Sequence, residues 1–143
     1  MPGHALAGRI LIVEGDAETR ELLAGFLTSH GYHVDEAADG EAGLYLVYEA
    51  ETPYDLVLLD DHLPDATARE MLPALRALAA GSRVAVMSDA TSCGVFYEVR
   101  ARGAYEVIQK PPWLRDVLQV VARGLGERRA EALSLVGDRL PGA

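Results

Sequence analysis

The stretch that decides the fold is Asp55-Leu56-Val57-Leu58-Leu59-Asp60-Asp61-His62-Leu63-Pro64. Uninterrupted apolar residues are followed by a pair of carboxylates, and a proline comes shortly after them. A strand that is apolar at every position is typical of a parallel sheet covered on both faces. Such sheets place their chemistry just beyond the carboxyl ends of the strands. The pattern therefore predicts a buried strand that delivers Asp60 to a functional rim, whereas Asp61 is interpreted as a loop acid that caps the next helix.

The bulk composition describes one globular domain of ordinary polarity. The chain has 143 residues, 50% of them hydrophobic and 24% charged, which suffices for one core and is too short for two. Its net charge of −9 argues against nucleic acid as a direct partner, since binding phosphates needs a basic face. Cys93 is the only cysteine, which excludes a disulfide framework or a cysteine metal site, and we expect it to be a small buried side chain.

The ends of the chain carry no recognisable targeting or membrane segment. Residues 1–8 lack a basic start and are too weakly apolar for a signal peptide, and no apolar run reaches membrane-spanning length. We therefore expect a cytoplasmic protein without membrane contact. Residues 1–8 are expected to be disordered, 9–123 to form the domain, and 124–143 to be a helical extension that ends in a tail or a linker, frayed from residue 137 onward.

Apolar strands alternate with amphipathic helices along the whole chain. Strands are predicted over residues 10–13, 32–37, 56–59, 83–87 and 106–109, and helices over about 16–30, 39–50, 66–80, 91–100 and 113–135. Thr91 and Ser92 are the expected cap of the fourth helix. The short connections favour right-handed crossovers between parallel strands. The fold class is therefore predicted as α/β, a doubly wound, open five-stranded parallel sheet with helices on both faces.

Polar side chains follow four of the predicted strands. Glu14 and Asp16 come after the first, Asp60 after the third, Ser88 after the fourth and Lys110 after the fifth. Taken singly, each has an ordinary explanation, because acids at strand–helix turns are often caps and a lysine before proline is often solvated. Since the strand ends of a parallel sheet meet at one rim, together they describe a hard-cation site beside a carboxylate that could accept a phosphoryl group.

Over roughly Arg9 to Arg123 the chain resembles a response regulator receiver domain. The matching pieces are the acidic turn Glu14-Gly15-Asp16, the central stretch from Asp55 to Pro64, Ser88, the pair Gly103-Ala104 and the pair Lys110-Pro111. The resemblance implies the (βα)5 flavodoxin-like receiver fold with strand order 2-1-3-4-5. It also implies a phospho-aspartate switch in two-component phosphorelay signalling, rather than an enzyme.

The resemblance further implies a role for each rim residue. Asp60 would be the phosphoacceptor, Ser88 would hydrogen-bond the phosphoryl group and Lys110 would pair with it, through a cis Lys110–Pro111 peptide bond. Glu14, Asp60 and the backbone carbonyl of His62 would hold Mg²⁺. The family normally has a second acid where this chain has Gly15, and Asp16 is a candidate to replace it. We therefore expect weak Mg²⁺ binding, because each missing carboxylate weakens such a site.

Three further positions depart from the family pattern. Asp89 follows Ser88 where a small residue is usual, Thr67 and Ala68 replace an acid and a glycine, and Val107 stands where an aromatic switch residue is common. Two hypotheses follow: a phosphoacceptor switch, or a degenerate receiver-fold interaction module whose output is independent of phosphorylation. A nucleotide-binding protein is disfavoured, because no glycine-rich loop follows the first strand.

The resemblance also implies the kinds of partner. Phosphate would come from a histidine kinase or phosphotransfer protein, and the signal would pass to a downstream effector or output domain. The fourth helix, fifth strand and fifth helix form the usual partner face, here a possible homodimer surface. It would carry Arg100, Arg102, Glu106, Arg115 and Asp116, with Tyr97 or Tyr105 as aromatic anchors. The alternative is that these are ordinary solvated side chains.

Overall fold

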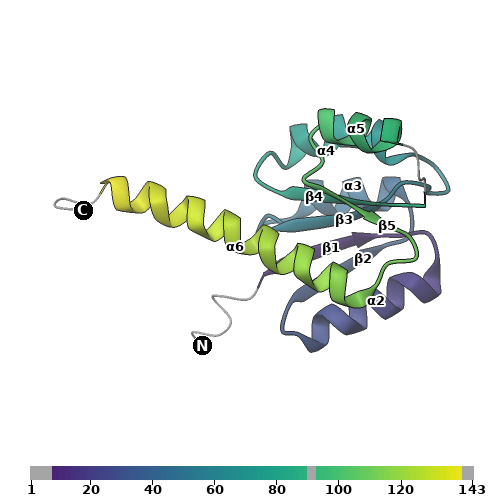
Figure 1. Ribbon diagram of the computed structural model, residues 1–143, viewed down its shortest axis with the longest axis horizontal. Helices are drawn as coiled ribbons and strands as arrows, with labels where there is room; N and C mark the ends of the chain where they lie inside the picture. Colours follow the sequence, from purple (N-terminus) through teal and green to yellow (C-terminus); the bar gives the residue numbers. More distant parts are fainter. Residues whose placement is uncertain (1–7, 90–92, 140–143) are drawn as a thin grey trace.

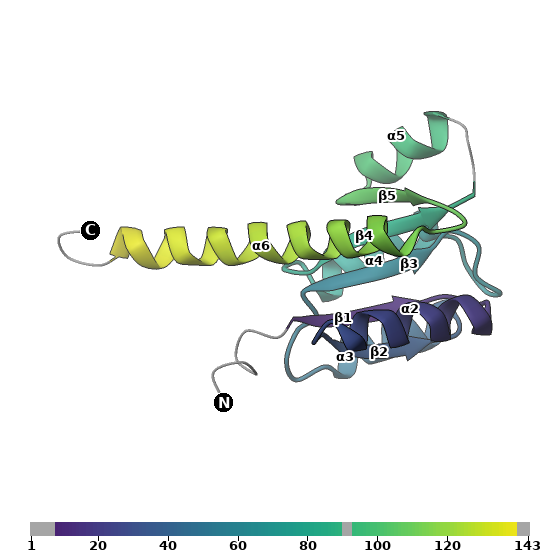
Figure 2. The ribbon, with the colours of Figure 1, turned by 60° about the horizontal axis from the view of Figure 1, so that its bottom comes forward.

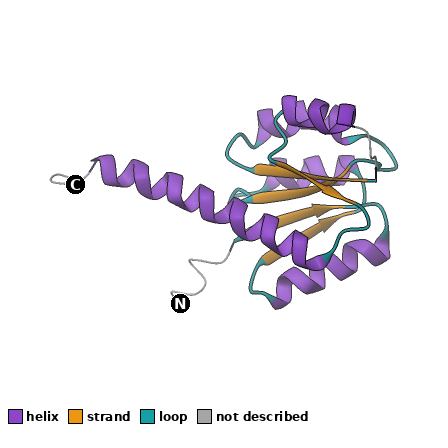
Figure 3. Ribbon diagram, in the orientation of Figure 1, coloured by secondary structure: helices purple, strands orange, loops and turns teal. Residues whose placement is uncertain are grey.

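The computed structural model of the chain describes residues 8–89 and 93–139, and its centre is a five-stranded parallel sheet in the order β2-β1-β3-β4-β5 (Figure 1). The strands are β1 Arg9–Val13, β2 His33–Ala37, β3 Leu56–Asp60, β4 Arg83–Ser88 and β5 Glu106–Gln109. The helices that alternate with them are α2 Ala17–Ser29, α3 Gly40–Glu49, α4 Ala68–Leu78, α5 Cys93–Ala101 and α6 Leu114–Arg139 (Figure 3). The predicted fold class and strand order are confirmed.

The central strand β3 is buried at every position, as its unbroken apolar run predicts. Leu56 and Leu58 pack in the core under α2 and α6, whereas Val57 and Leu59 pack in the core under α3, α4 and α5. In Figure 2, α2 and α6 lie in front of the sheet, and α3 and α4 lie behind it. Successive side chains of a strand point to opposite faces of the sheet. Because helices cover both faces here, every residue from Leu56 to Leu59 must be apolar.

The helices of the first three crossovers begin at side-chain caps. Asp16 accepts a hydrogen bond from the Thr19 amide at the start of α2, and Asp39 caps α3 in the same way. Thr67 caps α4 and forms a reciprocal capping box with Glu70. The interpretation of Asp61 as the cap of the next helix is therefore wrong, since Thr67 fills that position.

Some boundaries differ from the sequence-based expectations. Strand β4 extends through Ser88, which pairs with Gln109 of β5, and α4 begins at Ala68 rather than at residue 66. Helix α6 continues to Arg139 and projects beyond the sheet (Figure 1), so the frayed tail expected from residue 137 is wrong for 137–139. Gly124 lies within this helix and is buried, and the missing side chain allows close packing against Leu56.

Several expectations concern residues outside or at the border of the described ranges. Thr91 and Ser92, the expected cap of the fourth helix, lie outside the described residues, as do residues 1–7 and the side chain of Cys93. Gly8 is buried, and its carbonyl accepts a hydrogen bond from the His33 amide at 2.9 Å. Over the described ranges, no helix combines the length and apolar character that crossing a membrane requires.

Candidate functional site

An acid pair lies at the carboxyl ends of the two central strands. Strands β1 and β3 pair with Val13 opposite Leu59, so the next residues, Glu14 and Asp60, leave the sheet side by side. Both side chains are almost fully buried, with 1% and 4% of their surfaces exposed. The backbone of Glu14 is fixed on both sides, because its amide donates to Ala37 and its carbonyl accepts from Arg20 at 2.8 Å.

Lys110 reaches this acid pair from the loop that follows β5. Its Nζ lies 3.0 Å from Asp60 Oδ1 and 3.3 Å from Glu14 Oε2. Asp60 Oδ1 also accepts a hydrogen bond from the His62 amide at 3.2 Å. Within the described residues, Oδ2 of Asp60 accepts no hydrogen bond, so one carboxylate oxygen remains available for bond formation. The peptide bond between Lys110 and Pro111 is cis, as the resemblance implies.

The site contains two buried carboxyl groups, Glu14 and Asp60, and one lysine, Lys110, and the pKa values of Glu14 and Lys110 reflect this imbalance. Burial raises the pKa of Glu14, and the adjacent Asp60 adds to the increase more than the nearby Lys110 offsets it. Burial by itself lowers the pKa of Lys110, but the hydrogen bond and charge of Asp60, with help from Glu14, leave it above its usual value. Lys110 is therefore a positive charge next to two buried carboxyl groups. An anion added to Asp60 would be attracted to this charge.

Asp16, the further candidate ligand, is turned toward helix α2. Its carboxylate accepts hydrogen bonds from the Thr19 hydroxyl at 2.6 Å and the Thr19 amide at 2.9 Å, and these bonds lower its pKa. Only its backbone approaches the acid pair, by donating to Glu14 Oε1 at 3.1 Å. Consistent with this, the described part of the chain brings no three acidic, histidine or cysteine side chains together as a ready metal site.

The oxygen atoms that remain still suit a hard cation. Glu14 Oε2 is buried and accepts no hydrogen bond, although Lys110 lies near it, and Asp60 Oδ2 is available beside it. Carboxylate and carbonyl oxygens are the ligands that Mg²⁺ prefers, with water completing the octahedron. Glu14, Asp60 and the His62 carbonyl therefore fit Mg²⁺ by chemistry, with fewer carboxylates than a site in which residue 15 is also acidic.

Ser88 faces a residue whose role the sequence did not reveal. It is buried at the end of β4, and its Oγ donates to Asp61 Oδ2 at 3.3 Å. Asp61 is itself only 5% exposed, and its Oδ1 is buried without a hydrogen bond. No local pattern marks Asp61 as buried, because it lies beyond the end of β3 and its burial depends on the neighbouring strand and helix that cover it.

The other departures from the family pattern lie outside the acid pair. Asp89 is largely exposed and lies 3.7 Å from His62 Nε2, so its bulk is directed away from the buried carboxylates. Val107 is half-buried and packs with the core under α3, α4 and α5. Tyr105 lies beneath the guanidinium of Arg83, 4.8 Å from its ring centre. None of these residues provides an aromatic side chain next to Ser88.

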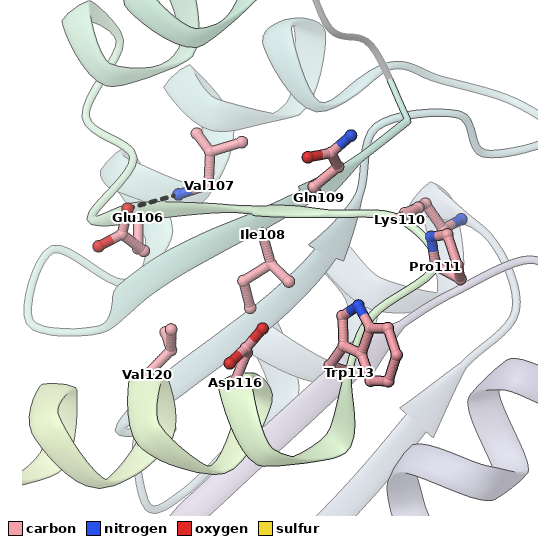
Figure 4. Close-up of a pocket in the computed structure, with 9 residues that line it drawn as sticks. All are labelled: Glu106, Val107, Ile108, Gln109, Lys110, Pro111, Trp113, Asp116 and Val120. Atoms are coloured by element: carbon pink, nitrogen blue, oxygen red, sulfur yellow. Dashed lines mark hydrogen bonds between the residues drawn. The ribbon is translucent and has the colours of Figure 1, made fainter.

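The expected partner face carries internal ion pairs and an open groove. Glu106 pairs with Arg100 at 2.8 Å and with Arg123 at 2.7 Å. Figure 4 shows the groove between β5 and the start of α6, a cavity of about 480 Å³ beside Trp113, which is 74% exposed. Tyr97 on α5 is also exposed. Several of the predicted contact residues are thus already engaged within the chain, while aromatic side chains remain at the surface.

The fold and this rim define a class: doubly wound α/β domains with an acid pair and a lysine at the carboxyl ends of the strands. The comparisons with known proteins narrow the class. A family model described as the response regulator receiver domain matches residues 10–122, so the chain belongs to that family. Receiver domains act as phosphorylation switches of two-component systems rather than as enzymes in the ordinary sense, and they generally bind Mg²⁺ at an acidic pocket.

Individual relatives agree with this assignment. The chain is 30% identical to the DNA-binding transcriptional regulator NtrC of Bradyrhizobium sp. (strain RP501 Parasponia), over 92% of this chain and 27% of that protein. It is 30% identical to the cell cycle transcriptional regulator CtrA of Caulobacter vibrioides, over 91% of this chain and 56% of that protein. The chain thus spans about a quarter to about half of these regulators.

A solved structure supports the fold independently. A CheY-like receiver domain from Methanospirillum hungatei JF-1 superposes with a TM-score of 0.82 at 29% identity, covering 87% of this chain and 98% of that one. The match therefore includes nearly all of a receiver domain.

Proposed function

We propose that Asp60 is the phosphoacceptor of a two-component phosphorelay. The observation that carries the proposal is the 3.0 Å contact between Lys110 Nζ and a buried Asp60 carboxylate whose other oxygen is available. In the transfer, an Asp60 oxygen forms a bond to phosphorus while the bond from phosphorus to the donor breaks. The donor, a histidine nitrogen or the acyl oxygen of acetyl phosphate, leaves with the bonding electron pair.

The neighbouring side chains stabilise the anion that results. A phosphoryl group adds about −1.5 to −2 charges at neutral pH, which is costly to bury among carboxylates. Lys110 supplies a positive charge already within hydrogen-bond distance of Asp60. Ser88 lies at the end of the adjacent strand β4, and in this proposal its hydroxyl donates to a phosphoryl oxygen. Mg²⁺, when bound, supplies the additional positive charge that offsets the carboxylates.

We expect the chain to bind this cation weakly. Glu14, Asp60 and the His62 carbonyl are the proposed ligands, and Asp16 can contribute only if its carboxylate leaves the cap of α2, where Thr19 holds it. Mg²⁺ requires a near-octahedral set of oxygens and sheds water reluctantly, so a missing carboxylate lowers affinity directly.

The proposal extends to partners and domain organisation. Phosphate comes from a histidine kinase or phosphotransfer protein, and the change is read by a downstream effector or output domain, at a face on α5, β5 and α6 that can also serve a homodimer. Residues 9–123 form the receiver unit, and 124–143 form an extension or linker whose helical part continues α6. We place the protein in the cytoplasm and assign it no direct contact with nucleic acid or membranes.

The decisive experiment is phosphorylation by a small donor. The purified chain is incubated with acetyl phosphate and Mg²⁺ and examined by intact mass spectrometry. We expect one phosphoryl group on the wild type, none on Asp60→Asn, and labelling retained in the neighbouring control Asp61→Asn. Equal labelling of Asp60→Asn and wild type would refute Asp60 as the acceptor.

A second function is favoured by a specific observation. Gly15 supplies no ligand and Asp16 caps α2, so the acidic turn delivers a single carboxylate, Glu14, to the acid pair. In this reading the domain is an interaction module whose output is independent of phosphate. Absence of labelling in the wild type at millimolar Mg²⁺, with partner binding retained by Asp60→Asn, would favour it.

A further inference from the structure

Asp61 is a buried acidic residue with few partners inside the protein. Its side chain belongs to a residue only 5% exposed, and within the described residues no ion pair reaches it. Its Oδ1 is buried without any hydrogen bond, and its Oδ2 accepts one long bond, from Ser88 Oγ at 3.3 Å. Strong O–H···O⁻ bonds are about 2.5–2.7 Å long, so this contact compensates little of the cost of burying a carboxylate.

The nearby cation is committed elsewhere. Arg69, at the first turn of α4, donates to Glu98 at 2.9 Å. The pKa of Arg69 is raised mainly by the hydrogen bond and charge of Glu98, and the charge of Asp61 contributes less. Lys110, the other cation of the rim, contacts Asp60 and Glu14 instead. Asp61 is therefore a buried carboxyl group that neither of these cations contacts as an ion pair.

Ser88 brings this charge close to the position of an incoming phosphoryl group. In the proposed function, the Ser88 hydroxyl donates to a phosphoryl oxygen on Asp60. Because Ser88 Oγ lies 3.3 Å from Asp61 Oδ2, an oxygen hydrogen-bonded to the same hydroxyl would lie within about 6 Å of Asp61. A hydroxyl has one proton, so it cannot donate to both anions at once.

We propose that Asp61 opposes phosphorylation of Asp60 and thereby sets the phosphorylated fraction and its lifetime. The inference rests on the proposed function of Asp60. Repulsion between the buried carboxylate and the phosphoryl group raises the energy of the phosphorylated state, and competition for the Ser88 proton acts in the same direction. Since the carboxylate is shielded from water and ions, its effect is little screened.

The test removes the charge while keeping the shape. In Asp61→Asn, we expect the ratio of phosphorylated to unphosphorylated protein at fixed acetyl phosphate and Mg²⁺ to rise about tenfold. We also expect slower loss of phosphate after the donor is removed. Both quantities are measured by intact mass, with Asp60→Asn confirming the modified residue. If Asp61→Asn does not fold, Asp61→Ala removes the same charge and serves in its place.

Asp89→Asn is the matched control, because it removes the same charge one residue after Ser88 at a side chain that is 68% exposed. We expect it to have a clearly smaller effect, and only the effect of Asp61→Asn should persist at 0.5 M salt, where the screening length is about 4 Å. Equal effects of the two variants, or loss of the Asp61→Asn effect in salt, would overturn the inference.

The outcomes separate this inference from the proposed function. Labelling of wild type with an unchanged ratio in Asp61→Asn defeats the inference and leaves the function standing. Labelling of Asp61→Asn alone supports the inference and shows that Asp61 keeps the natural chain unphosphorylated. Absence of labelling in both defeats both.

Discussion

Two polar clusters of the sheet, one around Tyr54 and one at the carboxyl rim, differ in how their oxygen atoms are hydrogen-bonded. In the first cluster, the Tyr54 hydroxyl donates to Asp35 at 2.6 Å, and the Ser82 hydroxyl donates to the Tyr54 carbonyl at 2.6 Å. At the carboxyl rim, Glu14 Oε2 and Asp61 Oδ1 are buried without a hydrogen bond. The Tyr54 cluster is hydrogen-bonded, whereas the rim holds carboxylate oxygens that a cation or a new donor could engage.

This difference shows where stability and function are located. Buried polar groups are normally paired, so unpaired ones mark positions at which the fold accepts a cost. A paired network gives its full stabilisation to the protein as it stands. A carboxylate oxygen at the rim that accepts no hydrogen bond gains a partner only when a cation or a new donor arrives or when the acid is protonated. Substitutions in the two clusters should therefore change stability with opposite signs.

The largest effect is expected in the Tyr54 cluster. Tyr54→Phe removes a hydrogen bond to a carboxylate at a residue only 3% exposed, so we expect the free energy of unfolding to fall by about 1–2 kcal/mol. Burial, with Asp35, raises the Tyr54 pKa to about 12, so wild-type stability should decline as pH rises from 10 toward 12, and the variant should lack this decline. Denaturant unfolding measures both, with the exposed Tyr48→Phe as an unchanged control.

Glu14→Gln at the rim should change stability in the opposite direction, toward a higher free energy of unfolding at neutral pH. The Glu14 pKa is raised mainly by burial, so its folded state binds the proton more tightly and wild-type stability falls as pH rises above about 4.5. The variant should be more stable at neutral pH by about 1 kcal/mol and should lack this fall. Unfolding curves from pH 4 to 8 check this, with the exposed Glu49→Gln as control. A loss of stability at pH 7 would contradict the comparison.

Gly15→Asp tests whether the rim lacks a ligand. A Cβ at this position would lie 3.2 Å from Pro64 Cδ, so the proline must move slightly, and the backbone at Gly15 has no positive φ that would exclude aspartate. We expect Mg²⁺ affinity to increase several-fold, with a small loss of stability in the absence of metal. Gly15→Ala introduces the same contact without charge and should leave affinity unchanged, as measured by calorimetric titration. Equal affinity of Gly15→Asp and wild type would show that Asp16 already supplies the ligand.

The smallest effect is expected for an exposed acid that is paired. Asp65 accepts hydrogen bonds from the amides of Gly40 at 2.7 Å and Glu41 at 2.9 Å, and these lower its pKa. The contribution of Asp65 to stability is present at pH values above its pKa in the unfolded chain. It is lost as the pH falls through the lower pKa of the folded protein. Asp65→Asn should therefore lower the melting temperature slightly at pH 7 and not below about pH 3. Glu51→Gln, another exposed acid, should change neither value.

The sequence by itself determined the parallel sheet and the proximity of Lys110 to Asp60. An apolar run from Leu56 to Leu59 requires cover on both faces, and parallel strands bring their carboxyl ends to one rim, so the approach of Lys110 to Asp60 could be foreseen. The cap at Asp16 could also be foreseen, because it depends only on residues within one turn.

Only the tertiary structure decided the fate of Asp61 and the length of α6. Whether a carboxylate beyond a strand faces water or the interior depends on the helices and the neighbouring strand that close over it, and here Ser88 and α4 leave it buried. The sequence predicts this helix to about residue 135, whereas in the structure α6 continues to Arg139, and Gly124 within it packs against Leu56, a residue far away in the chain. Local patterns specify which conformations are available, whereas long-range packing decides which side chains lose contact with water.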